Sequence, residues 1–285
     1  TDSRLRLLPG YRRRLLDPVV AAIDHAVALV DDLPAPLVVA RHGDHDDPRL
    51  TSIFASPEAM LEELGRDLRL RDFLAGPGRG TEQVTALLRV ELSEKHIFGR
   101  DLVDGLMRRD VPQTAVNVSG HRLADPAGTE LETRRLLKQR TFDHVVRLAL
   151  ARITSAQTER ADLARQRDLL RRKLSAQERG DWSFDPPQGA FPDRRALRAE
   201  LERITHQLDA LGTEDKVLSV HLEMVAEALR DAGRQLWSRD ISLHLDAMNI
   251  KRHPRDPTGR RVILRELHDA LGHCSILLLL TLAPG

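Results

Sequence analysis

Residues 141–174 read TFDHVVRLALARITSAQTERADLARQRDLLRRKL, and their apolar side chains recur at alternating steps of four and three residues. Residues 194–236, RRALRAELERITHQLDALGTEDKVLSVHLEMVAEALRDAGRQL, keep the same spacing. This spacing averages 3.5 residues per turn, the period that keeps one apolar stripe facing a partner helix. The two segments therefore predict two long helices that pack on each other through these stripes.

The segment between the two predicted helices, which we call the arms, indicates that they run in opposite directions. Residues 180–192 read GDWSFDPPQGAFP, and no helix can cross Pro186 and Pro187, which lack the amide donor. Because the arms are similar in length, we expect an antiparallel coiled-coil hairpin over residues 129–238 with its tip at 180–192. Thr129 is the expected N-cap of the first arm.

Three aromatic residues lie in the expected tip: Trp182, Phe184 and Phe191. Aromatic side chains at a projecting tip are candidate anchors for a protein partner. The alternative is that they pack on one another and close the tip.

The stripes contain polar positions that bear on how the arms align. The antiparallel alignment places Arg160 beside Leu211 and Asp215. A seam arginine requires a partner, because burying an unpaired charge is costly. We therefore expect an Arg160–Asp215 ion pair that sets the register. The stripe does not slip across Gly212, so we expect the second arm to continue there as one helix with a kink.

The rest of the chain predicts a small α+β body with antiparallel strands. Apolar and polar residues alternate within 85–121, which suggests two or three strands, and again from residue 241. Residues 274–282 are nearly all apolar, as in a central strand covered on both faces, whereas 266–271 suggest a short helix or a connection.

The expected fold class is thus α+β, with the long hairpin inserted in or joined to this body. The expected divisions are an N-terminal α+β region (1–128), the hairpin (129–238) and a β-rich segment (239–285) that packs with the first. The alternative is two separate lobes joined by the hairpin.

Two clusters contain side chains that bind metals. His42, Asp44 and His45 lie in the loop 42–47, which also has the composition of a plain turn. Near the C-terminus, four residues lie close together in the sequence and suggest a metal or acid–base role: Glu266, His268, His273 and Cys274.

Composition and motifs narrow the function classes. The formal net charge of +1 argues against an overall polyanion-binding surface. No stretch matches a catalytic or nucleotide-binding motif, so no cofactor is expected, and no apolar run reaches the 18 residues of a membrane span. The single cysteine fits a reducing compartment, and we expect the cytoplasm.

These observations predict a non-enzymatic scaffold or adaptor, or a self-assembling structural protein, whose hairpin contacts a protein partner or a second copy. One alternative is a nucleic-acid-associated protein that uses the arginine-rich faces of residues 4–14 and 160–172. The other is a metal-dependent enzyme centred on the His42–Asp47 loop.

Overall fold

A computed structural model describes residues 5–6, 8–39, 47–103, 106–180, 194–212 and 216–283. The chain is an α+β protein that divides into two compact units. The helical unit comprises Thr1–Ala22 and His144–Ala232, and the sheet unit comprises Ile23–Asp143 and Gly233–Gly285. Two helices, α1 (Tyr11–Asp31) and α5 (Glu130–Gly180), contribute residues to both units.

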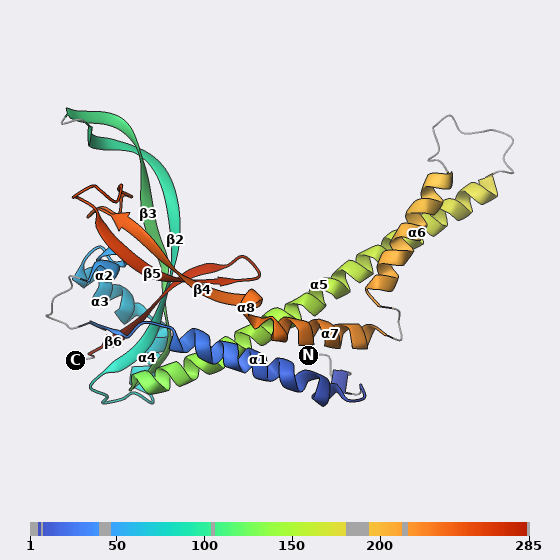
Figure 1. The fold of residues 1–285 in the computed structure, drawn as a ribbon, viewed down its shortest axis with the longest axis horizontal. Coiled ribbons are helices and arrows are strands. Elements are labelled where there is room, and N and C mark those ends of the chain that lie inside the picture. Colours follow the sequence, from blue (N-terminus) through green and yellow to red (C-terminus); the bar gives the residue numbers. More distant parts are fainter. Residues whose placement is uncertain are drawn as a thin grey trace. The chain divides into compact units, whose positions relative to one another are not determined.

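The sheet unit is built on a single six-stranded sheet (Figure 1). Its strands follow the order β3-β2-β6-β5-β4, with the short strand β1 paired in parallel to β6. All other strand pairs are antiparallel. The strand bounds are β1 Leu37–Val39, β2 Val84–Val103, β3 Leu106–Ala127, β4 Leu236–Leu245, β5 Arg260–Asp269 and β6 Cys274–Leu282.

Strand β6 is the centre of this sheet, as its apolar sequence predicts. It pairs with β2 through residues 276–282 and with β5 through residues 274–277. Its residues from Ser275 to Leu280 are all buried, because helices cover both faces of the sheet at this strand.

Different helices cover the two faces. One face carries the main core, to which α2 (Pro48–Ile53), α3 (Pro57–Arg66) and α4 (Leu68–Ala75) contribute apolar side chains. The opposite face carries a smaller core that joins Val30 of α1 and Leu137 of α5 to strands β2 and β6. The sheet unit is therefore a three-layer arrangement of helices, sheet and helices.

The structure decides two points about the strands. Residues 85–121 belong to two of the expected two or three strands, β2 and β3, which pair along nearly their whole length. Residues 266–269 belong to β5 rather than to a short helix, because β4 on one side and β6 on the other supply their backbone partners.

The helical unit contains the C-terminal part of α5 together with α6 (Arg194–Ala210) and α7 (Val217–Arg230). Helix α5 is one uninterrupted helix of 51 residues, which corresponds to roughly 75 Å at 1.5 Å per residue. Its start is capped as expected, since the Thr129 hydroxyl accepts the Glu132 amide at 3.3 Å. A short helix, α8 (Ala232–Gln235), leads into β4.

The expected second arm is wrong in one respect, because it is not a single helix. Helix α6 ends at Ala210, and Gly212 adopts a φ of +99° that right-handed helices do not contain. A new helix, α7, begins at Val217. Among the helices of the described ranges, none combines the length and apolarity that crossing a membrane requires.

Candidate functional site

The strand register of β4, β5 and β6 gathers five polar and aromatic side chains on one face of the sheet. Trp237, His268 and Cys274 form one row across the three strands. The neighbouring row consists of Arg239, Glu266 and Ile276. Because alternate residues of a strand share a face, both rows point to the same side. That side carries the main core, which includes Ile276, so the polar residues lie at the margin of the core.

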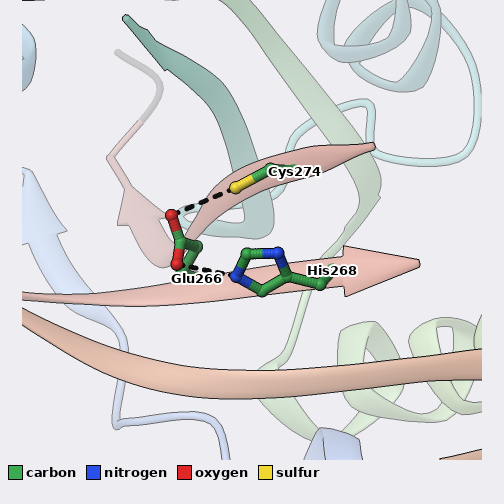
Figure 2. Close-up of side chains that lie close together, drawn as sticks. All are labelled: Glu266, His268 and Cys274. Atoms are coloured by element: carbon green, nitrogen blue, oxygen red, sulfur yellow. Dashed lines mark hydrogen bonds and ion pairs between the residues drawn. The ribbon is translucent and has the colours of Figure 1, made fainter. Parts of the chain in front are cut away.

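Three of these side chains are in direct contact, and we call them the Glu266–His268–Cys274 cluster (Figure 2). The Glu266 carboxylate lies between the other two side chains. Its Oε2 is 2.7 Å from His268 Nε2, and its Oε1 accepts a hydrogen bond from Cys274 Sγ at 3.1 Å. Arg239 Nε also donates to Glu266 Oε2, at 2.8 Å.

These contacts determine the charges in the cluster. Burial alone would raise the pKa of Glu266, but hydrogen bonds from Cys274, Arg239 and His268 outweigh it and lower that pKa. Burial and the adjacent Glu266 carboxylate raise the pKa of Cys274 to about 11. At pH 7 Cys274 is therefore a thiol rather than a thiolate. The thiol is therefore a poor nucleophile unless a cation displaces its proton.

Neighbouring groups hold the cluster in place. The indole of Trp237 stacks on the His268 imidazole, with ring centroids 5.5 Å apart and planes 8° apart. The turn between β5 and β6 is closed by Asp269, whose Oδ1 accepts the Leu271 and His273 amides at 2.9 and 3.0 Å. The His273 ring lies 2.9 Å from the other oxygen of Asp269. His273, grouped with the cluster by sequence alone, therefore belongs to the turn.

The cluster has the composition of a metal-binding group. Its nitrogen, sulfur and oxygen ligand atoms all lie within 4.8 Å of one another. It is the one set of at least three such side chains found in the part of the chain that the structure describes. Glu266 and His268 are half-buried, whereas Cys274 is exposed, so one side of the cluster faces solvent.

Arg160 lies in a pocket of the helical unit. The pocket has a volume of about 580 Å³, and its wall includes Arg160, Ala164 and Arg167 of α5. Leu208 and Asp209 of α6, Gly212, and the first residues of α7 complete the lining. Arg167 bonds to the adjacent Asp168 at 3.0 Å.

Several expected site residues lie outside the described residues. They are His42, Asp44 and His45 of the expected metal loop, Trp182, Phe184 and Phe191 of the expected tip, and Asp215, the expected partner of Arg160. The loop metal site, the aromatic contacts and the Arg160–Asp215 pair therefore stay predictions. Asp47, at the end of the loop, is described and serves as the N-cap of α2, where its side chain accepts the Arg49 amide.

The arginine-rich faces show partners in the described ranges. Arg14 bonds to Glu223 at 3.0 Å and to Ser219 at 3.2 Å, which joins α1 to α7 within the helical unit. Arg165 pairs with Asp162 on the same face of α5. These acidic neighbours reduce the positive charge available to a polyanion.

Sequence reasoning identified Glu266, His268 and Cys274 but missed Trp237 and Arg239. The missed residues lie on β4, about thirty residues earlier in the chain, and only the β4–β5 register brings them to the cluster. A signal was present in the alternating pattern of β4, but using it required the pairing of Trp237 with His268.

Comparison of the chain with protein-family models, with curated proteins and with solved structures gave no match.

Proposed function

We propose that the protein is a non-enzymatic scaffold or adaptor in which α5, α6 and α7 form an antiparallel helical hairpin that contacts a protein partner or a second copy. The observation that carries this proposal is the burial of apolar stripe positions in all three helices. Ile153 and Leu174 of α5 are 8% exposed, Ile204 of α6 is 1% exposed and Leu222 of α7 is 1% exposed. Apolar side chains at this spacing are buried when helices pack along their stripes.

Contacts between the helices support an antiparallel order. Arg198 of α6 lies 3.6 Å from Glu178 near the end of α5, and Arg194 donates to the Gln177 carbonyl at 3.5 Å. The pocket around Arg160, about seventeen residues earlier in α5, is lined by the end of α6 and the start of α7. These contacts support an arrangement in which α6 starts beside the C-terminal end of α5 and α7 starts beside an earlier part of α5.

An intrachain cross-link tests the hairpin. In a Cys274→Ser background, cysteines replace Glu178 and Arg198, and a short bis-maleimide is added to dilute protein. We expect a cross-linked monomer in high yield, because the hairpin brings these positions together within one chain. A matched pair at positions 159 and 198 should give no product. Cross-linked dimers without intrachain product would overturn the closed hairpin.

The partner contact is tested at the expected tip. We expect Trp182→Ala to weaken partner binding or self-association without changing helicity or melting, because an exposed anchor contributes to an interface rather than to the fold. The measurements are light scattering over a concentration range and affinity capture with the full chain. Phe98→Ala, at an aromatic residue that is 77% exposed in the sheet unit, is the matched control.

Two outcomes would contradict the proposal. One is a chain that stays monomeric at every concentration and captures the same proteins with Trp182→Ala as without it. The other is a variant that loses its fold, which would assign Trp182 to closing the tip.

A further inference from the structure

We propose that Glu266, His268 and Cys274 form a mononuclear site for a borderline-soft divalent transition metal, of which Zn²⁺ is the best fit. The site belongs to the sheet unit and is independent of the proposed scaffold function, because none of its residues lies on α5, α6 or α7. Both proposals can therefore fail or succeed separately.

The ligand types select the metal. One imidazole nitrogen, one thiol sulfur and one carboxylate oxygen form a mixed set that suits zinc, whereas calcium and magnesium prefer oxygen ligands alone. Three protein ligands leave one position of a tetrahedron open for water. The exposure of Cys274 provides the solvent-facing side on which that water would lie.

The geometry suits these bonds. Zinc bonds of about 2.0–2.3 Å in a tetrahedron place neighbouring ligand atoms roughly 3.3–3.6 Å apart. Cys274 Sγ lies 3.1 Å from Glu266 Oε1, His268 Nε2 lies 2.7 Å from the other carboxylate oxygen, and one ligand atom of each residue lies within 4.8 Å of the other two. A small opening of the cluster, with rotation of side chains on a fixed strand framework, brings the three atoms to bonding distance.

The surrounding residues act as supports for such a site. Arg239 donates to Glu266 Oε2, which leaves Oε1 as the metal ligand and fixes the plane of the carboxylate. Trp237 stacks on His268 and restricts the rotation of the imidazole. The hydrogen-bonded β5–β6 turn, closed by Asp269, holds Cys274 opposite His268.

Binding is coupled to proton release. As the metal binds, the Cys274 thiol gives its proton to solvent, and the Nε2 proton that His268 donates to Glu266 leaves to solvent or moves to Nδ1, which frees the Nε2 lone pair for the metal. Metal binding should therefore be weaker at lower pH.

Cobalt titration of untagged, chelator-treated full chain tests the site directly. We expect one equivalent to bind, with a thiolate-to-cobalt charge-transfer band and the intense visible bands of tetrahedral Co²⁺, and Zn²⁺ to displace it. Cys274→Ser should abolish the charge-transfer band. His268→Gln and Glu266→Gln should each weaken binding by more than the 10–100-fold typical of outer-shell partners.

His273→Gln is the matched control, because His273 is adjacent to Cys274 but contacts Asp269. We expect its titration to equal that of the parent chain. Loss of binding in this variant, or full retention in Cys274→Ser, would overturn the assignment. So would an octahedral cobalt spectrum or the absence of binding.

A second measurement requires no variant, so it holds even if a substitution disturbs folding. Cys274 is the one cysteine of the chain, and alkylation measured by mass therefore reports on it alone. We expect Zn²⁺ at one equivalent to slow alkylation by at least about tenfold, as a coordinated thiolate is blocked, and Mg²⁺ to have no effect. Equal rates with and without Zn²⁺ would exclude the site.

Discussion

Asp269 shows how much a single buried carboxylate contributes to a turn. It is 6% exposed and accepts three hydrogen bonds or contacts from Leu271 and His273. Removing this buried acceptor breaks the hydrogen bonds from the Leu271 and His273 amides, at a cost of about 1–3 kcal/mol. The β5–β6 turn is also what places Cys274 beside His268, so this residue connects stability to the candidate metal site.

We expect Asp269→Ala to lower the free energy of unfolding by about 1–3 kcal/mol in urea titrations at neutral pH. Asp256→Ala is the control, because Asp256 makes similar contacts to Thr258 but is more exposed than Asp269. The loss for Asp256→Ala should be much smaller. Equal losses would mean that burial of Asp269 contributes nothing.

The same residue predicts a pH dependence. Burial opposes the charge on Asp269, but hydrogen bonds from His273 and Leu271 outweigh it and lower its pKa in the folded chain. A lowered folded pKa contributes stability above the unfolded pKa, and that stability is lost as pH falls through the folded pKa. Asp269→Asn should therefore flatten the decline of unfolding free energy between about pH 5 and pH 2. If the unfolding free energy of the variant declined at acid pH as steeply as that of the parent chain, the prediction would be contradicted.

At the scale of elements, helix ends were predictable because caps are local. Thr129 caps α5 as expected, and Ser56 caps α3 by the same kind of local hydrogen bond. The end of strand β5 was harder to predict, because the sequence of Glu266–Asp269 fits both a helix and a strand. The pairing with β4, which is distant in the sequence, and with β6, which follows a turn, decides for the strand. The same holds for the Glu266–His268–Cys274 cluster. Its three members could be grouped from the sequence because they lie near one another in it, whereas Trp237 and Arg239 come from another strand and could not.

The break between α6 and α7 was missed because the apolar spacing continues through it. The spacing of apolar residues does not specify the backbone conformation of each residue, and Gly212 has a positive φ. The expectation of one continuous second arm was therefore wrong, although several of its apolar positions in α6 and α7 are buried.

Replacement by alanine should have opposite effects on stability at Gly212, in the break between α6 and α7, and at Gly65, inside α3. Gly212→Ala should destabilise the chain by about 1–2 kcal/mol, because its φ of +99° is unfavourable for alanine. An added Cβ would also meet Val217 and Val220 at 3.2 Å. Gly65→Ala, in α3 with open space around its Cβ position, should stabilise by about 0.5–1 kcal/mol. Thermal and urea unfolding measure both, and a stabilising Gly212→Ala would show that α6 and α7 can join as one helix.

At the scale of the whole molecule, stability is unevenly distributed. Strand β6 has paired neighbours on both sides and helices over both faces, whereas β3 and β4 lie at the ends of the sheet path. Beyond residue 90, β2 no longer pairs with β6 and is bonded to β3 alone among the described strands. The central strand should therefore open only with the unfolding of the sheet, and the outer parts should open locally.

Native-state hydrogen exchange measures this difference. We expect the amides of residues 276–280 and of residues 84–90 to exchange slowest in the sheet unit, because they combine strand pairing with burial. Amides in residues 92–103 and 106–114 should exchange faster by orders of magnitude. Uniform protection along β2 would contradict the expectation of local opening.

The position of β6 in the sheet also has a consequence for synthesis. Strand β2 is made early, but its β6 neighbour is encoded about 190 residues later, after α5, α6 and α7. At a translation rate of about 5–20 residues per second, residues 84–90 leave the ribosome on the order of ten seconds or more before residues 276–282. During that interval the buried edge of β2 has no native partner, so a nascent chain stalled before residue 274 is the form most exposed to aggregation and most in need of a chaperone.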